Sequence, residues 1–278
     1  RADGGPEGRL RLAADAALLE ARGLGKSFPG VVALDDVGMV VRRGEVVAVI
    51  GENGAGKSTL MKVLAGVHEP DVGEILWDGV PVRIDSVRRA AELGIALIHQ
   101  ELNLCGTLSA GATVFLGREP RRRFGALRPR EIDAAATPFL ERVGLRVSPS
   151  MPASKLSIGQ QQLVEIAKAL SQDAQLLIMD EPTSSLSFDE ASRLFGVIRD
   201  LRSHGVTVVY ITHRLHEVEV LADRVVGLRD GRNSGELTRD RIGHRAMVRL
   251  MVGRDIEVRP RRRRPLDSPV RLAVRGLR

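Results

Sequence analysis

The chain has 278 residues, of which 43% are hydrophobic and 28% charged, a balance typical of folded globular proteins with a sizeable core. Its net charge is +7, but the arginine runs at residues 121–123 and 261–264 lack the interleaved aromatic side chains on which bases stack, so we expect no nucleic-acid partner. No run of about eighteen apolar residues occurs, which excludes a membrane-spanning helix in this sequence.

The first part of the chain is predicted to form a small antiparallel layer. Residues 1–17 are rich in Gly, Ala and charged side chains, which favours a loose leader. Apolar residues then mark short strands at residues 19–24, 31–34 and 37–41, and a further strand at residues 73–79 ends in an Asp-Gly turn. We expect these strands to pack beside the main sheet.

A glycine-rich segment follows a buried apolar strand predicted at residues 46–50. It fits the pattern G-x-x-x-x-G-K-[ST], and residues 59–65 after it have helical spacing. A strand, a glycine loop and a helix start place backbone N–H groups at the positive end of a helix, where phosphates bind. We therefore predict a nucleotide site formed by Gly51, Glu52, Asn53, Gly54, Ala55, Gly56, Lys57, Ser58 and Thr59.

Four side chains carry the chemistry expected of this site. Lys57 supplies a mobile positive charge for the β- and γ-phosphates, and Ser58 offers a hydroxyl group to Mg²⁺. Asp180 ends a second buried strand, at the position of the carboxylate that holds Mg²⁺ directly or through water in nucleoside triphosphatases. Glu181 follows and is free to polarise water, so the residues predict hydrolysis of ATP with Mg²⁺.

Between these motifs, the chain becomes mainly helical over about residues 101–170. A buried strand at residues 95–98 precedes this region. Apolar spacing predicts a helix over residues 132–143, which Pro138 should kink or divide because proline removes a helical hydrogen bond. A second helix is predicted to begin at Ser157, since Ser157 and Gln160 fit a capping box.

The second half of the chain alternates strands and helices. Buried strands at residues 176–179 and 206–211, joined by a helix, form a βαβ unit, which indicates an α/β fold. Residues 225–228 and an Asp-Gly turn complete this part. Residues 254–270 hold three prolines and an arginine run, which predicts a linker. The six residues from Leu272 then partly repeat the first predicted strand, although chance remains an alternative.

Further motifs resemble those of ABC-type ATPases. Residues 156–160 look like the family's signature motif and precede Asp180, as the family requires. Four other elements match in order: the aromatic A-loop residue (Phe28), the Q-loop glutamine (Gln100), the D-loop (residues 184–187) and the switch histidine (His213). The resemblance implies a P-loop NTPase (RecA-like) core with an N-terminal antiparallel β layer and an inserted α-helical subdomain, the ABC ATPase fold.

The resemblance also implies a site shared by two domains. ATP would lie on the phosphate loop of one domain, with Phe28 stacked on adenine. Glu181 would be the general base, His213 would hold the γ-phosphate and water, and Gln100 would sense the γ-phosphate and Mg²⁺, which Ser58 and Asp180 also bind. The signature of the other domain would close over the γ-phosphate through Ser157, Ile158, Gly159 and Gln160.

Several segments are similar to the carbohydrate-importer branch, of the ribose, galactose and xylose type. Ile158 replaces the second residue of the usual Ser-Gly-Gly-Gln core, and residues 28–34 and 251–254 are similar to this branch. Two departures occur. Thr113 replaces the branch's usual Asn, and Ser187 replaces the Asp of many ABC ATPases. Both departures leave the nucleotide site intact, but they make the assignment to this branch less specific.

In that branch the ATPase is one chain with two tandem nucleotide domains. We therefore expect an ABC ATPase domain over residues 18–253 and the start of a second one at residues 271–278. The implied function is to bind and hydrolyse ATP and so power import of a monosaccharide, at the cytoplasmic face of the membrane. The implied partners are permease subunits, a second ABC domain (tandem or homodimer) and, indirectly, a periplasmic or extracellular sugar-binding protein.

An alternative is a soluble ABC-type ATPase that acts on ribosomes or DNA, which the basic charge favours. DNA-repair members carry a long coiled coil between the phosphate loop and the signature, and none fits between Gln100 and Leu156. Ribosomal members join their domains by a long charged helix, whereas residues 254–270 are short and broken by prolines. These features favour the transporter.

Overall fold

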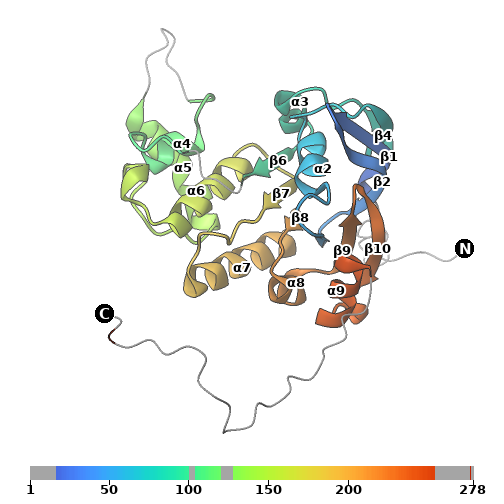
Figure 1. Cartoon of the computed structure of the whole chain (residues 1–278). Coiled ribbons are helices and arrows are strands. Elements are labelled where there is room, and N and C mark those ends of the chain that lie inside the picture. Colours follow the sequence, from blue (N-terminus) through green and yellow to red (C-terminus); the bar gives the residue numbers. More distant parts are fainter. Residues whose placement is uncertain (1–16, 100–103, 120–127, 254–275, 277–278) are drawn as a thin grey trace, which may run out of the picture.

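A computed structural model describes residues 17–99, 104–119, 128–253 and 276 (Figure 1). The predicted leader, apart from residue 17, and the linker at residues 254–270 lie outside the described residues. The same holds for Gln100 and for most of residues 271–278, so the predicted domain boundaries stay predictions.

The central sheet has six strands in the order β10-β9-β3-β8-β7-β6. Five run parallel, and β10 pairs antiparallel with β9. Their bounds are β3 Val46–Ile50, β6 Ile95–Ile98, β7 Leu176–Asp180, β8 Thr207–Ile211, β9 Arg224–Arg229 and β10 Arg232–Thr238. All but β10 were predicted as strands. No apolar pattern marks β10, because none of its residues is buried.

A second sheet is antiparallel, in the order β2-β1-β4-β5, which confirms the predicted β layer. Its strands are β1 Ala17–Phe28, β2 Val31–Arg42, β4 Val72–Trp77 and β5 Val80–Val82. The prediction of separate strands at residues 31–34 and 37–41 was wrong, because both belong to β2. Asp36 has a φ of 58°, and the register with β1 shifts beside it, so an irregularity interrupts the apolar alternation inside one strand.

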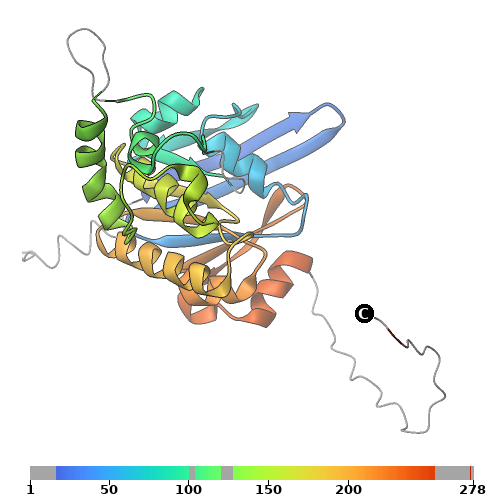
Figure 2. The ribbon, with the colours of Figure 1, turned by 90° about the vertical axis from the view of Figure 1, so that its left-hand side faces the viewer.

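Helices cover the central sheet, and their bounds are α2 Lys57–Leu64, α3 Val87–Glu92, α4 Ala110–Val114, α5 Pro129–Arg142, α6 Ile158–Leu170, α7 Phe188–Ser203, α8 Leu215–Leu221 and α9 His244–Val252, with short 3₁₀ turns η1 Ala153–Lys155 and η2 Arg239–Arg241. Figure 2 shows the helical region around α5 and the β1–β2 hairpin extending to opposite sides of the molecule. None of the described helices has the length and apolar character needed to cross a membrane.

Alternation along β7 explains the two-sided core. Leu176 and Ile178 join α2 and the antiparallel sheet in one apolar cluster, whereas Leu177 and Met179 join α5, α6 and α7 in another. Successive side chains of a strand point to opposite faces, so a strand covered on both faces is apolar throughout. The end of β7 is thereby held between two packed layers.

Helix α5 contradicts a division at Pro138, whereas a kink there stays a prediction, and α6 confirms a further prediction. Helix α5 runs through Pro138 without division, because Ala136 and Leu140 on either side of it are buried in the same apolar cluster. This packing offsets the missing hydrogen bond of the proline. Helix α6 begins at the predicted capping box, in which Ser157 and Gln160 satisfy each other's backbone N–H groups.

Candidate functional site

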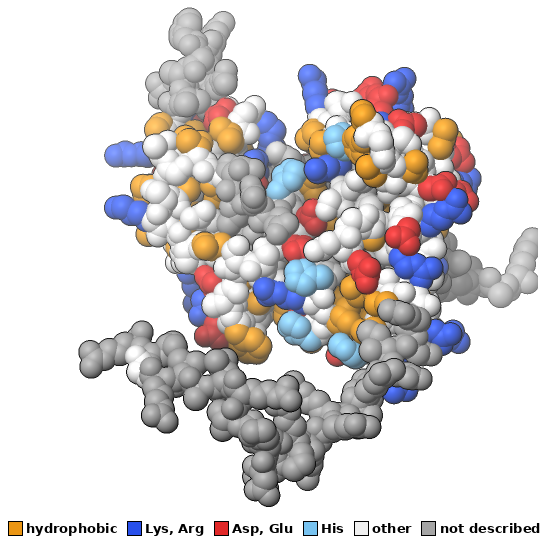
Figure 3. All heavy atoms as spheres, viewed as in Figure 1, with side chains coloured by type: hydrophobic (Ala, Val, Ile, Leu, Met, Phe, Trp, Pro, Cys, Tyr) orange, Lys and Arg blue, Asp and Glu red, His pale blue; other side chains and the backbone are white. Residues whose placement is uncertain are grey.

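A cavity of about 990 Å³ lies where β3, β7 and β8 end. Open α/β sheets bind ligands at this carboxyl edge of their strands. In Figure 3, acidic and histidine side chains gather in the hollow between the helical region and the sheet-bearing part. The cavity lining comprises Phe28, Val31, Ala33, Gly51, Glu52, Asn53, Gly54, Gly56, Lys57, Ser58, Thr59, Asp180, Glu181, His213 and Met251.

Two glycines of the phosphate loop are required by close approaches. A Cβ atom on Gly51 would lie 2.3 Å from the carbonyl oxygen of Leu228. Gly56 has a φ of 98°, and its Cβ would lie 2.6 Å from the carbonyl oxygen of Ala33. Helix α2 starts directly after Gly56 with neither a side-chain cap nor an acidic residue in its first turn. Its first N–H groups thus border the cavity as donors for an anion.

Lys57 is the buried cation of the site, with a relative exposure of 7%. Its Nζ donates to the carbonyl oxygens of Gly51 at 2.8 Å and Glu52 at 2.9 Å. Burial lowers the pKa of Lys57, while the charges of Glu181 and Asp180 oppose this shift. An ammonium group has three donors, so these two bonds leave one N–H for a phosphate oxygen.

Asp180 ends β7 and is paired with the phosphate loop. Burial raises its pKa, the hydrogen bond with the Ser58 side chain opposes the shift, and the charge of Glu181 adds to it. A hydroxyl and a carboxylate side by side are oxygen ligands of the kind that Mg²⁺ takes together with phosphates and water. The pair therefore fits this ion, which would offset the cost of the buried carboxylate charge.

Glu181 and His213 meet across the ends of β7 and β8. His213 Nδ1 lies 2.9 Å from Glu181 Oε1, and the backbone N–H of Glu181 donates to the carbonyl oxygen of Ile211 at 2.9 Å. Glu181 has a φ of 46°, a left-handed conformation that is uncommon for a residue with a side chain. Such strain persists only where surrounding contacts enforce it, and it clusters at functional sites.

Phe28 lies at the edge of the cavity, at the end of β1. Phe28 is 37% exposed, and its ring meets the His68 ring edge-on, with 5.3 Å between the centroids. Lys26 Nζ lies 5.8 Å from the centroid of the Phe28 ring. A half-exposed ring at this edge is available for stacking on a base.

The signature residues do not line this cavity. Instead, the Ser157 hydroxyl donates to Glu190 Oε1 at 2.8 Å, and the N–H of Gly159 donates to the same oxygen at 3.2 Å. Glu190 belongs to α7, where it also forms a capping box with Ser187. Glu190 is not among the residues that the sequence motifs indicate, although Ser187 and Glu190 show the S-x-x-E spacing of such a box.

A family model described as "ABC transporter" matches residues 34–184, which is more than half of the chain. The chain belongs to the ABC transporter family. The resemblance seen in the motifs is thereby confirmed.

The relatives of this ABC cassette include proteins named as ATP-binding proteins of sugar import. A protein named "Ribose import ATP-binding protein RbsA" from Rhodopirellula baltica is 48% identical over 93% of this chain and 51% of its own length. A "Putative ribose/galactose/methyl galactoside import ATP-binding protein 1" from Burkholderia ambifaria is 49% identical over 99% of this chain and 52% of its own length. The chain thus spans about half the length of these curated relatives.

A solved structure supports the fold of the ABC cassette. The ADP conformation of MJ1267, an ATP-binding cassette of an ABC transporter, matches with a TM-score of 0.75 and 25% identity, over 86% of this chain and 99% of that one. The predicted ABC ATPase fold is therefore confirmed.

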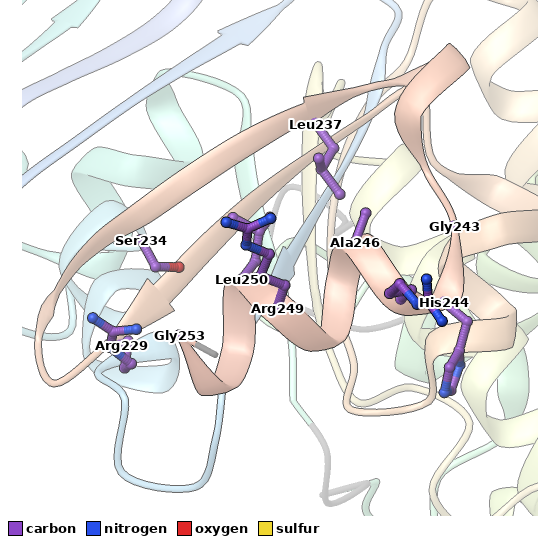
Figure 4. Close-up of a pocket in the computed structure, with 10 residues that line it drawn as sticks. Arg229, Ser234, Leu237, Gly243, His244, Ala246, Arg249, Leu250 and Gly253 are labelled. Carbon is purple, nitrogen blue, oxygen red and sulfur yellow. The ribbon is translucent and has the colours of Figure 1, made fainter. Parts of the chain in front are cut away.

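The ABC cassette has a second cavity of about 790 Å³, between the β9–β10 hairpin and α9 (Figure 4). Arg229, Arg245 and Arg249 line it, but none of the predicted site residues does. Helix α9 also places Met251 in the wall of the first cavity. The only sequence signal for Met251 was the resemblance of residues 251–254 to the importer branch, because α9 itself was not predicted.

Proposed function

We propose that this ABC cassette binds and hydrolyses ATP to power the import of a monosaccharide through a membrane transporter. The observation that carries the proposal is the meeting of Lys57, Asp180, Glu181 and His213 in one cavity at the carboxyl edge of the sheet. This arrangement places a phosphate-binding cation opposite two carboxylates, as hydrolysis of a nucleoside triphosphate requires.

Each residue has a proposed task. The loop N–H groups and Lys57 bind the phosphates, and Phe28 stacks on adenine. Ser58 and Asp180, with Gln100 as a further ligand, would hold Mg²⁺, which supplies charge neutralisation at the phosphate oxygens. Glu181 accepts the proton of the attacking water, and His213, whose Nδ1 lies 2.9 Å from Glu181 Oε1, holds that water and the γ-phosphate.

The complete site is proposed to need two cassettes. The signature residues Ser157 to Gln160 lie outside the cavity that Lys57 lines. The signature of a second ABC domain, in tandem or in a homodimer, would therefore close over the γ-phosphate. Ser157 and the N–H of Gly159 are the donors available for that contact.

Permease subunits are proposed to bind a groove of this cassette. This groove has a volume of about 210 Å³ and lies between α3, β6 and α6, with Val87, Ile98 and Lys168 among its lining residues. His99 lines it too and directly precedes Gln100. A permease segment bound here would be linked to the γ-phosphate through the Q-loop, and the sugar-binding protein would act indirectly through the permease. The cassette would then lie peripherally at the cytoplasmic face of the membrane.

The proposal that the transported substrate is a sugar rests on the relatives rather than on the cavity. Both relatives carry sugar-import names, which favours this function over the alternative of an ATPase acting on ribosomes or DNA. The specific sugar is set by proteins outside this chain.

The test is uptake of radiolabelled ribose, galactose and xylose in cells whose copy of this gene is deleted and then restored. The restored wild type should recover uptake of one sugar. Lys57→Ala should fail because it weakens nucleotide binding, whereas Glu181→Gln should fail with ATP still bound. Undiminished uptake of all three sugars in the deleted cells would rule out the import function.

A further inference from the structure

A buried carboxylate lies just outside the cavity. Glu217, in the first turn of α8, has a relative exposure of 1% and does not line the cavity. Its Oε1 accepts a hydrogen bond from Thr183 Oγ1 at 2.6 Å, and its Oε2 accepts from Tyr210 OH at 2.8 Å and Thr212 Oγ1 at 3.0 Å. One carboxylate thus binds three hydroxyl groups.

The three hydroxyl groups come from the two segments that carry the proposed catalytic pair. Thr183 follows Glu181 by two residues, in the turn after β7. Thr212 directly precedes His213, and Tyr210 belongs to β8. Glu217 therefore connects the turn after β7 with the end of β8 through hydrogen bonds to both segments.

Arg214 completes this connection. Its backbone N–H donates to Thr212 Oγ1 at 2.9 Å, and its guanidinium donates to the carbonyl oxygens of Thr183 at 3.0 Å and Ser184 at 3.4 Å. The same guanidinium lies 3.6 Å from Glu217 Oε1. A cation beside the carboxylate reduces the cost of burying its charge.

The chemistry of the donors requires an acceptor at this position. An ionised carboxylate accepts at both oxygens, which matches three donating hydroxyl groups. Burial raises the pKa of Tyr210 far above its usual range, so its hydroxyl stays protonated and donates. A glutamine at position 217 would keep the size but replace one acceptor oxygen with an N–H donor, which would face a hydroxyl group.

We propose that Glu217 is a positioning residue for ATP hydrolysis, which holds Glu181 and His213 in register by tying the turn after β7 to the end of β8. The left-handed backbone of Glu181 needs such support, because an unsupported turn would relax. The inference rests on the proposed roles of Glu181 and His213. A carboxylate that only filled the core would stabilise the fold without affecting the rate of hydrolysis by folded molecules.

The first experiment compares Glu217→Gln with Glu219→Gln, an exposed glutamate on the same helix. Nucleotide affinity, kcat at saturating MgATP and thermal unfolding are measured for each. We expect Glu217→Gln to lower kcat by about 10- to 100-fold, because small misplacements of catalytic groups have effects of this size. The affinity for ATP should stay within about twofold, because the phosphate loop is untouched, and Glu219→Gln should match the wild type. An unchanged kcat per folded molecule in Glu217→Gln would overturn the proposal.

A second pair of variants tests the same contact from the other side. Thr183→Val keeps the shape and removes the hydroxyl donor, whereas Thr183→Ser keeps the donor. We expect Thr183→Val to lower kcat and Thr183→Ser to retain most of it. This pair also decides the question if Glu217→Gln does not fold. Equal rates for Val and Ser at this position would contradict a role of the hydrogen bond.

A double variant separates this inference from the proposed function. Single-turnover hydrolysis, followed for hours, gives the rates of Glu181→Gln and of Glu181→Gln combined with Glu217→Gln. If Glu217 acts by positioning Glu181 and His213, replacing it costs less in the Glu181→Gln background than in the wild type, because one of the two groups that it positions is already absent. A further loss equal to that of Glu217→Gln alone would overturn the positioning role. Normal turnover by Glu181→Gln would instead reject Glu181 as the general base and so contradict the proposed function. The kcat of Glu217→Gln would still show whether Glu217 affects hydrolysis.

Discussion

At the scale of single residues, three members of the site have features that are unfavourable in the free protein. Burial disfavours the charged forms of both Lys57 and Asp180, and Glu181 has a left-handed backbone. A polyphosphate and its metal ion would relieve these costs, because they bring charges of both signs. Perturbed groups that gather in one cavity are typical of sites built for a ligand rather than for stability.

The pKa of Asp180 makes a prediction about stability and pH. Above its raised folded-state pKa, the folded chain carries a desolvated carboxylate whereas the unfolded chain carries a solvated one, so folding is penalised. Below its usual value of 3.8 both states are protonated and the penalty is lost. Asp180→Asn stays neutral, so without Mg²⁺ and nucleotide it should raise Tm at neutral pH, with a gain that shrinks as the pH falls toward that value. Thermal unfolding across this pH range measures the gain, and a constant gain would argue against burial of the charge.

Phe28 makes a prediction about nucleotide affinity. Phe28→Ala should weaken ATP binding by about 1–3 kcal/mol if the ring stacks on adenine as aromatic side chains stack on bases elsewhere. Binding of a ligand without a base, such as inorganic triphosphate, should be unaffected. Calorimetric titration with both ligands measures the difference. Equal affinity of the variant and the wild type for ATP would mean that Phe28 only packs against His68.

At the scale of elements, one carboxylate joins the starts of two helices. Glu190 Oε1 binds Ser157 and Gly159 at the start of α6, and Glu190 Oε2 binds the hydroxyl of Ser187 at 3.0 Å at the start of α7. A carboxylate is favourable at a helix N-terminus because of the unpaired N–H groups there. The position of the signature relative to the D-loop is therefore fixed by a side chain that belongs to neither motif.

A substitution at Gly159 tests this arrangement, and a substitution at Gly196 serves as its control. A Cβ on Gly159 would lie 2.7 Å from Glu190 Oε1, so Gly159→Ala should displace Glu190, and the loss of its hydrogen bonds should outweigh the gain in helix propensity and lower the free energy of unfolding by about 0.5–1.5 kcal/mol. Gly196, inside α7, has no atom within 4 Å of an added Cβ. Gly196→Ala should therefore stabilise by roughly 0.5–1 kcal/mol, since alanine favours a helix. Chemical denaturation measures both. A stabilising Gly159→Ala would show that Glu190 does not depend on this close approach.

At the scale of the whole molecule, the phosphate loop and the signature lie on different parts of the structure. Helix α2 packs under the antiparallel sheet, whereas α6 packs with α4, α5 and α7 on the other side of the central sheet (Figure 1). One cassette therefore offers a phosphate loop on one part and helix N-terminal donors on another. Two cassettes facing each other head to tail could pair them twice.

This geometry predicts that hydrolysis by the chain depends on association. The rate per molecule should rise with protein concentration until a dimer saturates. Lys57→Ala and Ser157→Arg should each be inactive alone, yet a mixture should regain part of the activity, because one composite site keeps both partners intact. ATPase assays over a range of concentrations check this. A rate per molecule that is flat with concentration, together with no rescue on mixing, would contradict the shared site.

The sequence by itself determined the elements whose signal is local. Glycine spacing marks the phosphate loop because only glycine permits its close approaches, and runs of apolar residues mark the parallel strands because both of their faces are buried. A capping box marked the start of α6 at Ser157. These features depend on neighbours within a few residues, so a pattern suffices to predict them.

The tertiary structure decided everything that depends on distant partners. The path of α5 through Pro138 was set by packing on either side of it, and the continuity of β2 across Asp36 was set by pairing with β1. The bonds of Glu217 to Thr183 and Tyr210 join residues up to 34 positions apart, and those of Glu190 to Ser157 span 33. A single glutamate has no pattern that reveals such a partner, because only the folded chain brings the donors to it.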